Sequence, residues 1–443
     1  MAVEAESVEG RGSAGARLRV GFLAQENLPV PPPALGGSVS RVIYELANPM
    51  ASAADVAVAA IRGEGLSDGI RDGVSYVYVE PRLDARPHAL AARVLDVHRK
   101  LDLPHRELQG LPFYSARYAR RGLELLEPFD LDVVHVQNVS QFLNRARHVY
   151  PRATLALHMH CDWLRELPPK TGRRWLRNAN LILGVSDYIT NGIRDTYPEL
   201  AERCRTLHNG VNPDVFPARN TLSPAQRDEV ESLRQELGLD DGPTAVYVGA
   251  FAPEKGVHVL LDAFSSLLRE VPSAKLILAG QHNRYFQVRA PRTRAARAAL
   301  RRRQDGYRSE LANHAARLGK SVVFAGRLPH DKLFALYGLA DVLVMPSTGQ
   351  EPFPLPVLEA FASAVPVVAT TRGGLPEAVV DGVTGLLVPD DERDALRDAI
   401  GSVLTDPEHR ERMGAAARAR ALEHFSWEGQ ARKLLRYYAE AGA

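Results

Sequence analysis

The chain has 443 residues, too many for one ordinary hydrophobic core and about the right number for two domains. Its 55 Lys and Arg residues nearly balance 53 Asp and Glu residues, which argues against a protein built mainly to bind nucleic acid or an acidic surface. Hydrophobic residues make up 45% of the chain and charged residues 24%, a balance that argues against wholesale disorder.

The two cysteines, Cys161 and Cys204, cannot form a disulfide framework, which fits a reducing compartment. No apolar run approaches the ~20 residues that a membrane helix requires, so we expect no transmembrane segment, and peripheral membrane contact is left open. Residues 1–16 are rich in Glu, Ser, Gly and Ala and lack the apolar core of a secretory signal. The sequence therefore predicts a loose, disordered N-terminal tail and a cytoplasmic protein.

Short apolar runs alternate with helical stretches after this tail. The first run, residues 18–24, leads through a Pro-rich loop to Gly36, Gly37 and Ser38 and then to an apolar-periodic stretch at 39–47. This order predicts a buried strand, a glycine turn and a helix, with Ser38 expected to cap the helix. Further Val-, Leu- and Ile-rich runs of strand length follow at 55–61, 74–79, 132–137, 154–160 and 181–186.

The same alternation restarts in the second half of the chain. A polar, helix-like linker at 223–239 precedes a second set of runs with strand composition, at 244–250, 275–280, 321–326, 341–347 and 366–370. A turn-rich segment at 381–388 and two helical stretches finish the chain. Strands that alternate with helices are typical of doubly wound sheets, whose ligands bind at the carboxyl ends of the strands. We therefore predict an α/β fold of two doubly wound, Rossmann-like domains that face each other across a cleft.

The composition also suggests where these domains begin and end. After the tail at 1–16, we place a first domain at 17–212 and a second at 213–426. The terminal stretch, 427–443, is long enough for a helix that crosses back onto the first domain.

An arginine-rich segment interrupts the pattern. It contains almost no acidic residue and has eight arginines, at positions 284, 289, 292, 294, 297, 301, 302 and 303. Such a segment could bind phosphate groups, a membrane surface or nucleic acid, or it could be a solvated helical insertion of biased composition. We favour the second interpretation because no apolar stripe accompanies the arginines, and we expect no nucleic-acid partner.

The strongest chemical signal is a pair of carboxylates eight positions apart, Glu351 and Glu359. Glu351 follows a predicted strand, and Pro356 suits the first turn of a helix that carries Glu359. An ionised carboxylate can accept paired hydrogen bonds from a vicinal diol, so one group could hold a sugar and the other a ribose. The helix start between them offers a positive dipole end to phosphates. Two solvated glutamates are the alternative for an isolated pair.

The segment EPFPLPVLEAFASAVPVVATTRGGLPEAVVDGVTGLLV at 351–388 resembles the donor-binding segment of glycosyltransferase family 4, retaining enzymes with the GT-B fold. The segments VGAFAPEKGVHVLLDAF (248–264) and HNGVNPDVF (208–216) fit the same family, as does the early Leu35-Gly36-Gly37. The similarity covers most of residues 18–435 and is greatest to the spore-coat-type and natural-product branch. It implies a first domain that binds the acceptor and a second that binds a nucleotide sugar.

The resemblance also implies roles for individual residues. Glu351 matches the family's donor-sugar carboxylate, and Glu359 matches the carboxylate that binds ribose hydroxyls. Lys255 matches the lysine that neutralises the donor diphosphate, and Gly36 and Gly37 match the glycine loop that approaches this diphosphate. The chemistry agrees, because glycine has no Cβ to block a close approach and an ammonium group can stabilise a leaving group without a metal. Taken alone, each could be an ordinary turn residue.

The remaining donor contacts that the resemblance implies lie in loops of the second domain. They are Gly249, Gly326, Arg327, Phe353, Pro354 and Leu355. The chain departs from the family pattern at Ala250, where an arginine is usual, and at Pro354, where a glycine is usual. Arg327 could replace the missing cation, whereas Pro354 removes one backbone N–H donor.

His158 and His160 lie two positions apart at the end of a predicted strand and therefore share one face. The resemblance implies that His160 contacts the donor sugar near the reacting centre. His158 could be a core histidine, and Ser186, at the next strand end, could face the same cleft. No further residues are spaced to complete a metal site with the two histidines.

Asp130 and Asp132 spell the Asp-x-Asp motif of metal-dependent transferases, but they directly precede a predicted strand and are better interpreted as a turn. We therefore predict a metal-independent enzyme without a cofactor, whose co-substrate is a nucleotide sugar such as a UDP- or GDP-sugar.

The resemblance implies a retaining hexosyltransferase that acts on a small-molecule or glycan acceptor. Three alternatives stay open. The chain could be a GT-B enzyme that does not transfer, such as a nucleotide-sugar epimerase or hydrolase. It could be a coat or binding protein that has lost turnover, or a nucleic-acid binder that acts through residues 284–303.

Overall fold

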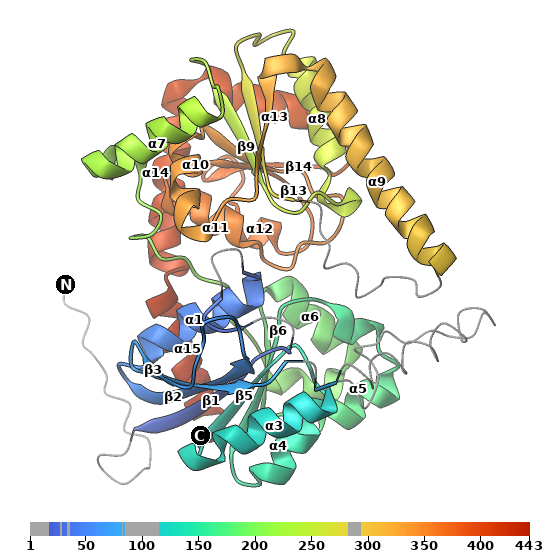
Figure 1. The fold of residues 1–443 in the computed structure, drawn as a ribbon, viewed down its shortest axis with the longest axis vertical. Helices are drawn as coiled ribbons and strands as arrows, with labels where there is room; N and C mark the ends of the chain where they lie inside the picture. The colour runs from blue at the N-terminus through green and yellow to red at the C-terminus, as the bar shows by residue number, and fades with distance from the viewer. Residues whose placement is uncertain (1–16, 27–28, 33–35, 82, 85–114, 282–293) are drawn as a thin grey trace.

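The computed structural model describes residues 17–26, 29–32, 36–81, 83–84, 115–281 and 294–443. These residues form two α/β domains, one above the other along the longest axis of the molecule (Figure 1). The predicted tail at 1–16 and the segment at 284–293 lie outside the described residues. Residues 294–303 form the first turns of a helix, α9 (Arg294–Arg317).

The first domain is built on an eight-stranded sheet in the order β3-β4-β2-β1-β5-β6-β7-β8. Its neighbouring strands are parallel except for the β3–β4 pair. The strands are β1 (Leu18–Leu23), β2 (Ala54–Ile61), β3 (Gly69–Arg71), β4 (Val74–Val79), β5 (Val133–Gln137), β6 (Thr154–Met159), β7 (Leu181–Gly184) and β8 (Cys204–Thr206). Most are Val-, Leu- and Ala-rich because both faces of the sheet are covered by helices.

Alternate residues of β1 enter two different cores. Val20 and Phe22 pack with α1 (Ser38–Met50) on one face of the sheet. Leu23 packs with α3 (Ala116–Leu126) on the other. This second core also contains side chains of α4 (Phe142–Val149), α5 (Pro169–Leu176) and α6 (Asp187–Thr196).

The second domain has a six-stranded, fully parallel sheet in the order β11-β10-β9-β12-β13-β14. The strands are β9 (Thr244–Val248), β10 (Lys275–Ala279), β11 (Val322–Gly326), β12 (Val342–Met345), β13 (Val367–Thr370) and β14 (Gly385–Val388). Its other helices are α7 (Pro224–Glu236), α8 (Val257–Leu267), α10 (Leu333–Leu339), α11 (Leu355–Ala362), α12 (Leu375–Ala378), α13 (Arg393–Thr405) and α14 (Pro407–His424). The linker helix α7 begins at a capping box formed by Ser223 and Gln226, with a proline in its first turn.

The last helix, α15 (Trp427–Glu440), lies beside α1 in the first domain (Figure 1). Trp427, Leu434 and Tyr438 are buried in the core that α1 and the first sheet share. The chain therefore passes from the second domain back to the first, and α15 ties the two together.

The observed fold confirms the predicted class of two Rossmann-like domains. Each predicted strand run contains a strand, and the segment expected to be turn-rich ends in β14. The two strands that the sequence did not indicate, β3 and β8, have only three residues each, too few for a hydrophobic pattern. The expected capping role of Ser38 is wrong: Ser38 is the first helical residue, Gly37 is the N-cap, and no side-chain cap is present.

Candidate functional site in the interdomain cleft

A cavity of about 620 Å³ lies between the domains, at the carboxyl ends of both sheets. Gln25 borders it from the loop after β1, and His160 borders it at the end of β6. From the second domain, Gly249, Gly280 and Arg327 follow β9, β10 and β11. The cavity therefore lies where strand ends from both domains converge, which matches the expected position of the ligand.

Lys255 reaches this cavity from a 3-10 turn at Pro253–Lys255. Gly256 ends the turn with φ at +69°, and a Cβ at this position would lie 1.8 Å from the carbonyl oxygen of Pro346. Only glycine allows the turn to pack this closely against the segment that follows β12. This close packing places the lysine beside the loop that carries Glu351.

Glu351 is the centre of a buried polar cluster on the wall of the cavity. Its Oε1 lies 2.7 Å from Nζ of Lys255 and accepts a hydrogen bond of 2.6 Å from the hydroxyl of Ser347. The Glu351 side chain is 4% exposed and that of Lys255 is 26% exposed. The ion pair holds the carboxylate at the surface of the cavity, and the ammonium group has N–H donors left for another acceptor.

The backbone around Glu351 is fixed by the loop between β13 and α12. The N–H of Gly374 donates to the carbonyl oxygen of Glu351 at 2.7 Å. Gly373 has φ at +60°, and a Cβ there would lie 2.1 Å from the same oxygen. The pair of glycines in this loop therefore lets two segments of the second domain meet without a side chain between them.

The glycine loop of the first domain forms the opposite wall. Gly36, Gly37, Ser38 and Val39 line the cavity at the start of α1. Because no described side chain caps this 13-residue helix, its first N–H groups are available to an anion in the cavity. Arg327 donates to the carbonyl oxygen of Gly36 at 3.2 Å and so brings a second cation next to this loop.

The histidines form a buried row across β5 and β6. His160 lines the cavity, and its Nε2 lies 2.7 Å from Oε1 of Gln137, while its backbone N–H donates to Asn138. Burial lowers the pKa of His160 well below its ordinary value, so the ring is neutral. The bond to Gln137 makes Nε2 the protonated nitrogen. His158 lies against His160 with the two rings tilted and their centroids 4.2 Å apart, and it does not line the cavity.

Glu359 differs from the expectation that both carboxylates face the gap. Its Oε2 accepts from the hydroxyl of Tyr337 at 2.9 Å, and its Oε1 lies 3.3 Å from Nε2 of His330. His330 lines the cavity and Glu359 does not. The physical reason is that a carboxylate buried on α11 needs partners, and these two side chains supply them. The predicted contact of Glu359 with ribose stays a prediction.

The other expected residues fall into two groups. Gly249, Phe353, Pro354 and Leu355 line the cavity, as does Ala250. Gly326 and Ser186 do not. Gly326 ends β11, and its carbonyl oxygen accepts from the N–H of Gly280, whereas Ser186 is the N-cap of α6.

Two family models match the chain, one to each domain. Residues 36–215 match "Glycosyltransferase Family 4", and residues 229–420 match "Glycosyl transferases group 1". The two matches include both walls of the cavity.

The chain belongs to glycosyltransferase family 4.

Two named relatives show the range of proteins to which the chain is similar. The chain is 26% identical over 429 residues to spore coat protein SA of Bacillus subtilis, covering 95% of this chain and 99% of the relative. It is 33% identical over 275 residues to alpha-maltose-1-phosphate synthase of Mycolicibacterium smegmatis, covering 60% and 64%. The matched domains and relatives make this chain an enzyme, a glycosyltransferase.

Solved structures show the same GT-B fold. A glycosyltransferase from Rickettsia africae superimposes with a TM-score of 0.71 at 16% identity, over 96% of this chain and 98% of that one. Anabaena Alr3699/HepE in complex with UDP superimposes with a TM-score of 0.67 at 19% identity, over 96% and 100%. Within the described residues of the glycosyltransferase, no helix has both the length and the apolar character to cross a membrane.

Three potential metal ligands of the enzyme, Asp187, His208 and Glu377, bring their ligand atoms within 4.8 Å of one another. They do not line the cavity. The carboxylate of Glu377 accepts from the backbone N–H groups of Asp187 and Tyr188 at 2.6 and 2.7 Å, and it lies 3.0 Å from Nε2 of His208. The cluster therefore joins the domains by hydrogen bonds, with Glu377 of α12 capping α6.

Asp130 and Asp132 lie at the start of β5, the end of the sheet away from the cleft. Both carboxylates bind the guanidinium group of Arg19, and this hydrogen bonding lowers the pKa of Asp132. Their role in the glycosyltransferase is that of a turn paired with an arginine, as expected.

Sequence reasoning missed several polar residues of the site. Two of them line the cavity, His330 and Asn209. The other two hold residues of the cavity wall, Ser347 at Glu351 and Gln137 at His160. Asn209 donates to the carbonyl oxygen of Phe353 at 2.8 Å and so connects the interdomain segment to the Glu351 loop. Asn209 could have been predicted from the sequence, because it belongs to the HNGVNPDVF segment that carries the resemblance. The others have no local signal, since their partners are distant in the chain.

Proposed function

We propose that the chain is a retaining, metal-independent glycosyltransferase that moves a hexose-type sugar from a nucleotide-diphosphate sugar to an acceptor hydroxyl. One observation carries the proposal: the Lys255–Glu351–Ser347 cluster lies on one wall of the interdomain cavity, and the uncapped N-terminus of α1 lies on the other. A sugar diphosphate needs both features, an acceptor for its hydroxyl groups and donors for its phosphates.

The donor diphosphate would lie between Lys255, Arg327 and the first N–H groups of α1. These groups stabilise the negative charge that grows on the leaving diphosphate, in a cleft where water screens it poorly. Because the two cations belong to the protein, this charge has partners without a metal ion. Glu351 would hold the sugar through paired hydrogen bonds to its hydroxyl groups.

Transfer breaks the bond between the anomeric carbon and the diphosphate oxygen and forms a bond from that carbon to the acceptor oxygen on the same face. The acceptor proton passes to an oxygen of the departing diphosphate, so no general base from the protein is required. Neutral His160, held by Gln137, can accept a hydrogen bond from the donor sugar through Nδ1 next to this centre.

The names of similar proteins support a nucleotide-sugar donor. Anabaena Alr3699/HepE has been solved with UDP-glucose, and a Mycolicibacterium smegmatis relative is named a GDP-mannose-dependent mannosyltransferase. The two bases differ between these proteins, so the choice between them rests on experiment.

The test is to incubate the full chain with a mixture of nucleotide sugars and identify by mass spectrometry which one is bound or consumed. NMR of the product then reports whether the anomeric configuration of the donor is retained, and EDTA reports any need for a metal. Turnover that is lost in EDTA and restored by a divalent cation would contradict the metal-independent proposal. An inverted anomer would contradict the retaining mechanism.

A transferase that also serves as a coat or binding protein is the second candidate, because a relative that covers 95% of the chain is named spore coat protein SA. The coat or binding role would not depend on turnover, so it would survive Glu351→Gln while sugar transfer is lost. A nucleotide-sugar epimerase or hydrolase would instead convert the donor at full rate with no acceptor present.

A further inference from the structure

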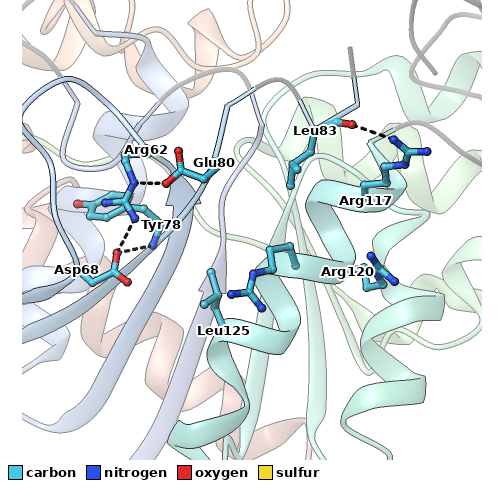
Figure 2. Close-up of a pocket in the computed structure, with 9 residues that line it drawn as sticks. Arg62, Asp68, Tyr78, Glu80, Leu83, Arg117, Arg120 and Leu125 are labelled. Carbon is cyan, nitrogen blue, oxygen red and sulfur yellow. Dashed lines mark hydrogen bonds and ion pairs between the residues drawn. The ribbon is translucent and has the colours of Figure 1, made fainter. Parts of the chain in front are cut away.

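A second pocket, of about 610 Å³, opens on the first domain and shares no lining residue with the cleft cavity. Figure 2 shows its two sides. Arg62 and Glu80 come directly after β2 and β4, and Arg117, Arg120 and Arg121 come from α3. Tyr78, Asp68, Leu83 and Leu125 complete the lining.

The two sides of this arginine pocket differ in how their charges are paired. Arg62 is already neutralised, because its Nε lies 2.6 Å from Glu80 and its guanidinium group lies 3.4 Å from Asp68 (Figure 2). On the helix side, Arg120 and Arg121 share Glu124 at the longer distances of 3.6 and 3.5 Å.

Arg117 has no carboxylate within ion-pair distance among the described residues. Its guanidinium group donates to the carbonyl oxygen of Leu83 at 3.4 Å, a contact drawn in Figure 2. Arg117 also stands three and four positions before Arg120 and Arg121. Like charges at this spacing destabilise an isolated helix, so the α3 side has an excess of positive charge that an anion would relieve. A guanidinium fork matches the oxygens of a phosphate group.

The backbone beneath Arg117 is fixed. The buried carboxylate of Asp84 accepts from the N–H groups of Arg117 and Tyr118 at 3.2 and 2.8 Å. Asp84 thereby caps α3, so an anion in the pocket would be held by the arginine side chains and not by the helix terminus. A rigid first turn loses less conformational entropy when its side chains bind a ligand.

The same turn also contacts the loop that leads to the cleft cavity. The hydroxyl of Tyr118 donates to the carbonyl oxygen of Ala24 at 2.9 Å, and the next residue, Gln25, lines the cleft cavity. The pocket therefore lies beside the cleft, at the carboxyl edge of the first sheet. The donor diphosphate already has Lys255, Arg327 and α1, so an anion in the arginine pocket belongs to a different molecule.

We propose that the arginine pocket binds a phosphate group carried by the acceptor, and that the pocket thereby selects phosphorylated acceptors. The inference rests on the proposed function, since it assigns the second substrate of the same cleft. The phosphate could belong to a soluble sugar or polyol phosphate or to a lipid headgroup that presents the acceptor at a membrane.

Binding is tested first, with the full chain and without any acceptor. Inorganic phosphate is titrated into the wild type, Arg117→Ala/Arg121→Ala and Arg174→Ala, an exposed arginine on α5 that serves as the matched control. Loss of charge-assisted hydrogen bonds predicts that the double variant weakens the pocket's affinity by about tenfold or more and that Arg174→Ala binds as the wild type does. Equal binding by all three proteins would overturn the proposal, because any phosphate held in the donor cavity is common to them.

Vesicles distinguish the two sources of the phosphate. Sedimentation with phosphatidylglycerol vesicles but not with phosphatidylcholine vesicles, lost in the double variant, would assign the pocket to a lipid headgroup. Phosphate binding without vesicle binding would assign it to a soluble phosphate ester. Binding to phosphatidylglycerol vesicles that the double variant retains would instead come from surface charge outside the pocket and would contradict the headgroup assignment.

Transfer is tested with pairs of acceptors that differ only by a phosphate ester, such as a sugar and its phosphate. The expected ratio of kcat/KM for the phosphorylated to the neutral acceptor is at least about tenfold in the wild type, and it collapses toward one in Arg117→Ala/Arg121→Ala. Arg117→Lys should restore part of it, because charge remains but the fork is lost. An unchanged kcat/KM ratio in the double variant would contradict the pocket assignment alone. Absence of donor turnover with every acceptor would contradict the proposed function.

Discussion

Two glutamates of the second domain lie at the interdomain boundary, the buried Glu351 and the half-buried Glu377, and their surroundings differ. Glu351 has a cation and a hydroxyl as partners, both from its own domain, and it faces an open cavity. Glu377 has three partners, all from the first domain, and it faces no cavity. The first carboxylate is preorganised before any ligand binds, whereas the second has its partners only when the domains are together. We therefore propose that the same residue type serves sugar binding in one region and domain closure in the other.

The largest effect on activity is expected from a substitution of Glu351. Glu351→Gln keeps the shape of the side chain and an oxygen for Ser347 but removes the charge, and we expect kcat/KM to fall by about 10² to 10⁴. The matched control is Glu229→Gln, which removes one carboxylate of the surface pair with Lys332. Steady-state kinetics and thermal melting measure both variants. A near-normal rate for Glu351→Gln would remove its assignment to the sugar.

Lys255→Ala is expected to follow, with a loss of about 10² to 10³ in kcat as one preorganised donor to the leaving group disappears. Lys255→Arg should recover part of the rate, and Lys332→Ala is the control outside the cleft. Donor affinity is measured in parallel by calorimetry. If Lys255→Ala loses only affinity and keeps its kcat, the lysine binds the ground state and does not stabilise the leaving group.

Glu377→Ala should have a smaller effect because it acts on closure. Loss of a helix cap costs about 1 to 2 kcal/mol, enough to lower the closed population and the rate by about tenfold. Small-angle X-ray scattering should show a larger radius of gyration in the variant, and saturating donor should reverse it. Glu377→Asp should be intermediate. Identical scattering curves and rates for variant and wild type would show that the contact is incidental to closure.

The smallest expected effect concerns pH. Burial lowers the pKa of His158 to about 3 and holds those of His135 and His160 well below the ordinary value. The unfolded chain takes up these protons below pH ~6.5 while the folded chain does not, so stability falls as the pH falls below ~6.5. Because His160 stays neutral, its titration contributes no step to the activity profile between pH 5 and 8.

Thermal melting from pH 7 down to pH 4.5 measures this dependence. His158→Leu should flatten the slope, whereas His148→Gln, at an exposed position on α4, should leave it unchanged. A slope that His158→Leu does not alter would show that the buried row does not govern acid stability.

Local sequence patterns predicted much of the donor side of the cleft. The strand runs, the proline at the start of α11 and the position of Glu351 after a strand all depend on residues close together in the chain. Predictions that needed knowledge of a side chain's distant partners were less complete. Glu359 has the expected place on its helix, but Tyr337 and His330 occupy its carboxylate.

The sequence by itself determined two doubly wound domains, their order and the places of Glu351 and Glu359 after a strand and on a helix, because periodicity and turn residues act over a few positions. Only the tertiary structure decided that Lys255 pairs with a carboxylate 96 positions away, that Arg327 reaches Gly36, and that Glu377 caps a helix of the other domain. These contacts depend on how sheets and helices pack, and packing brings together residues that no local pattern relates.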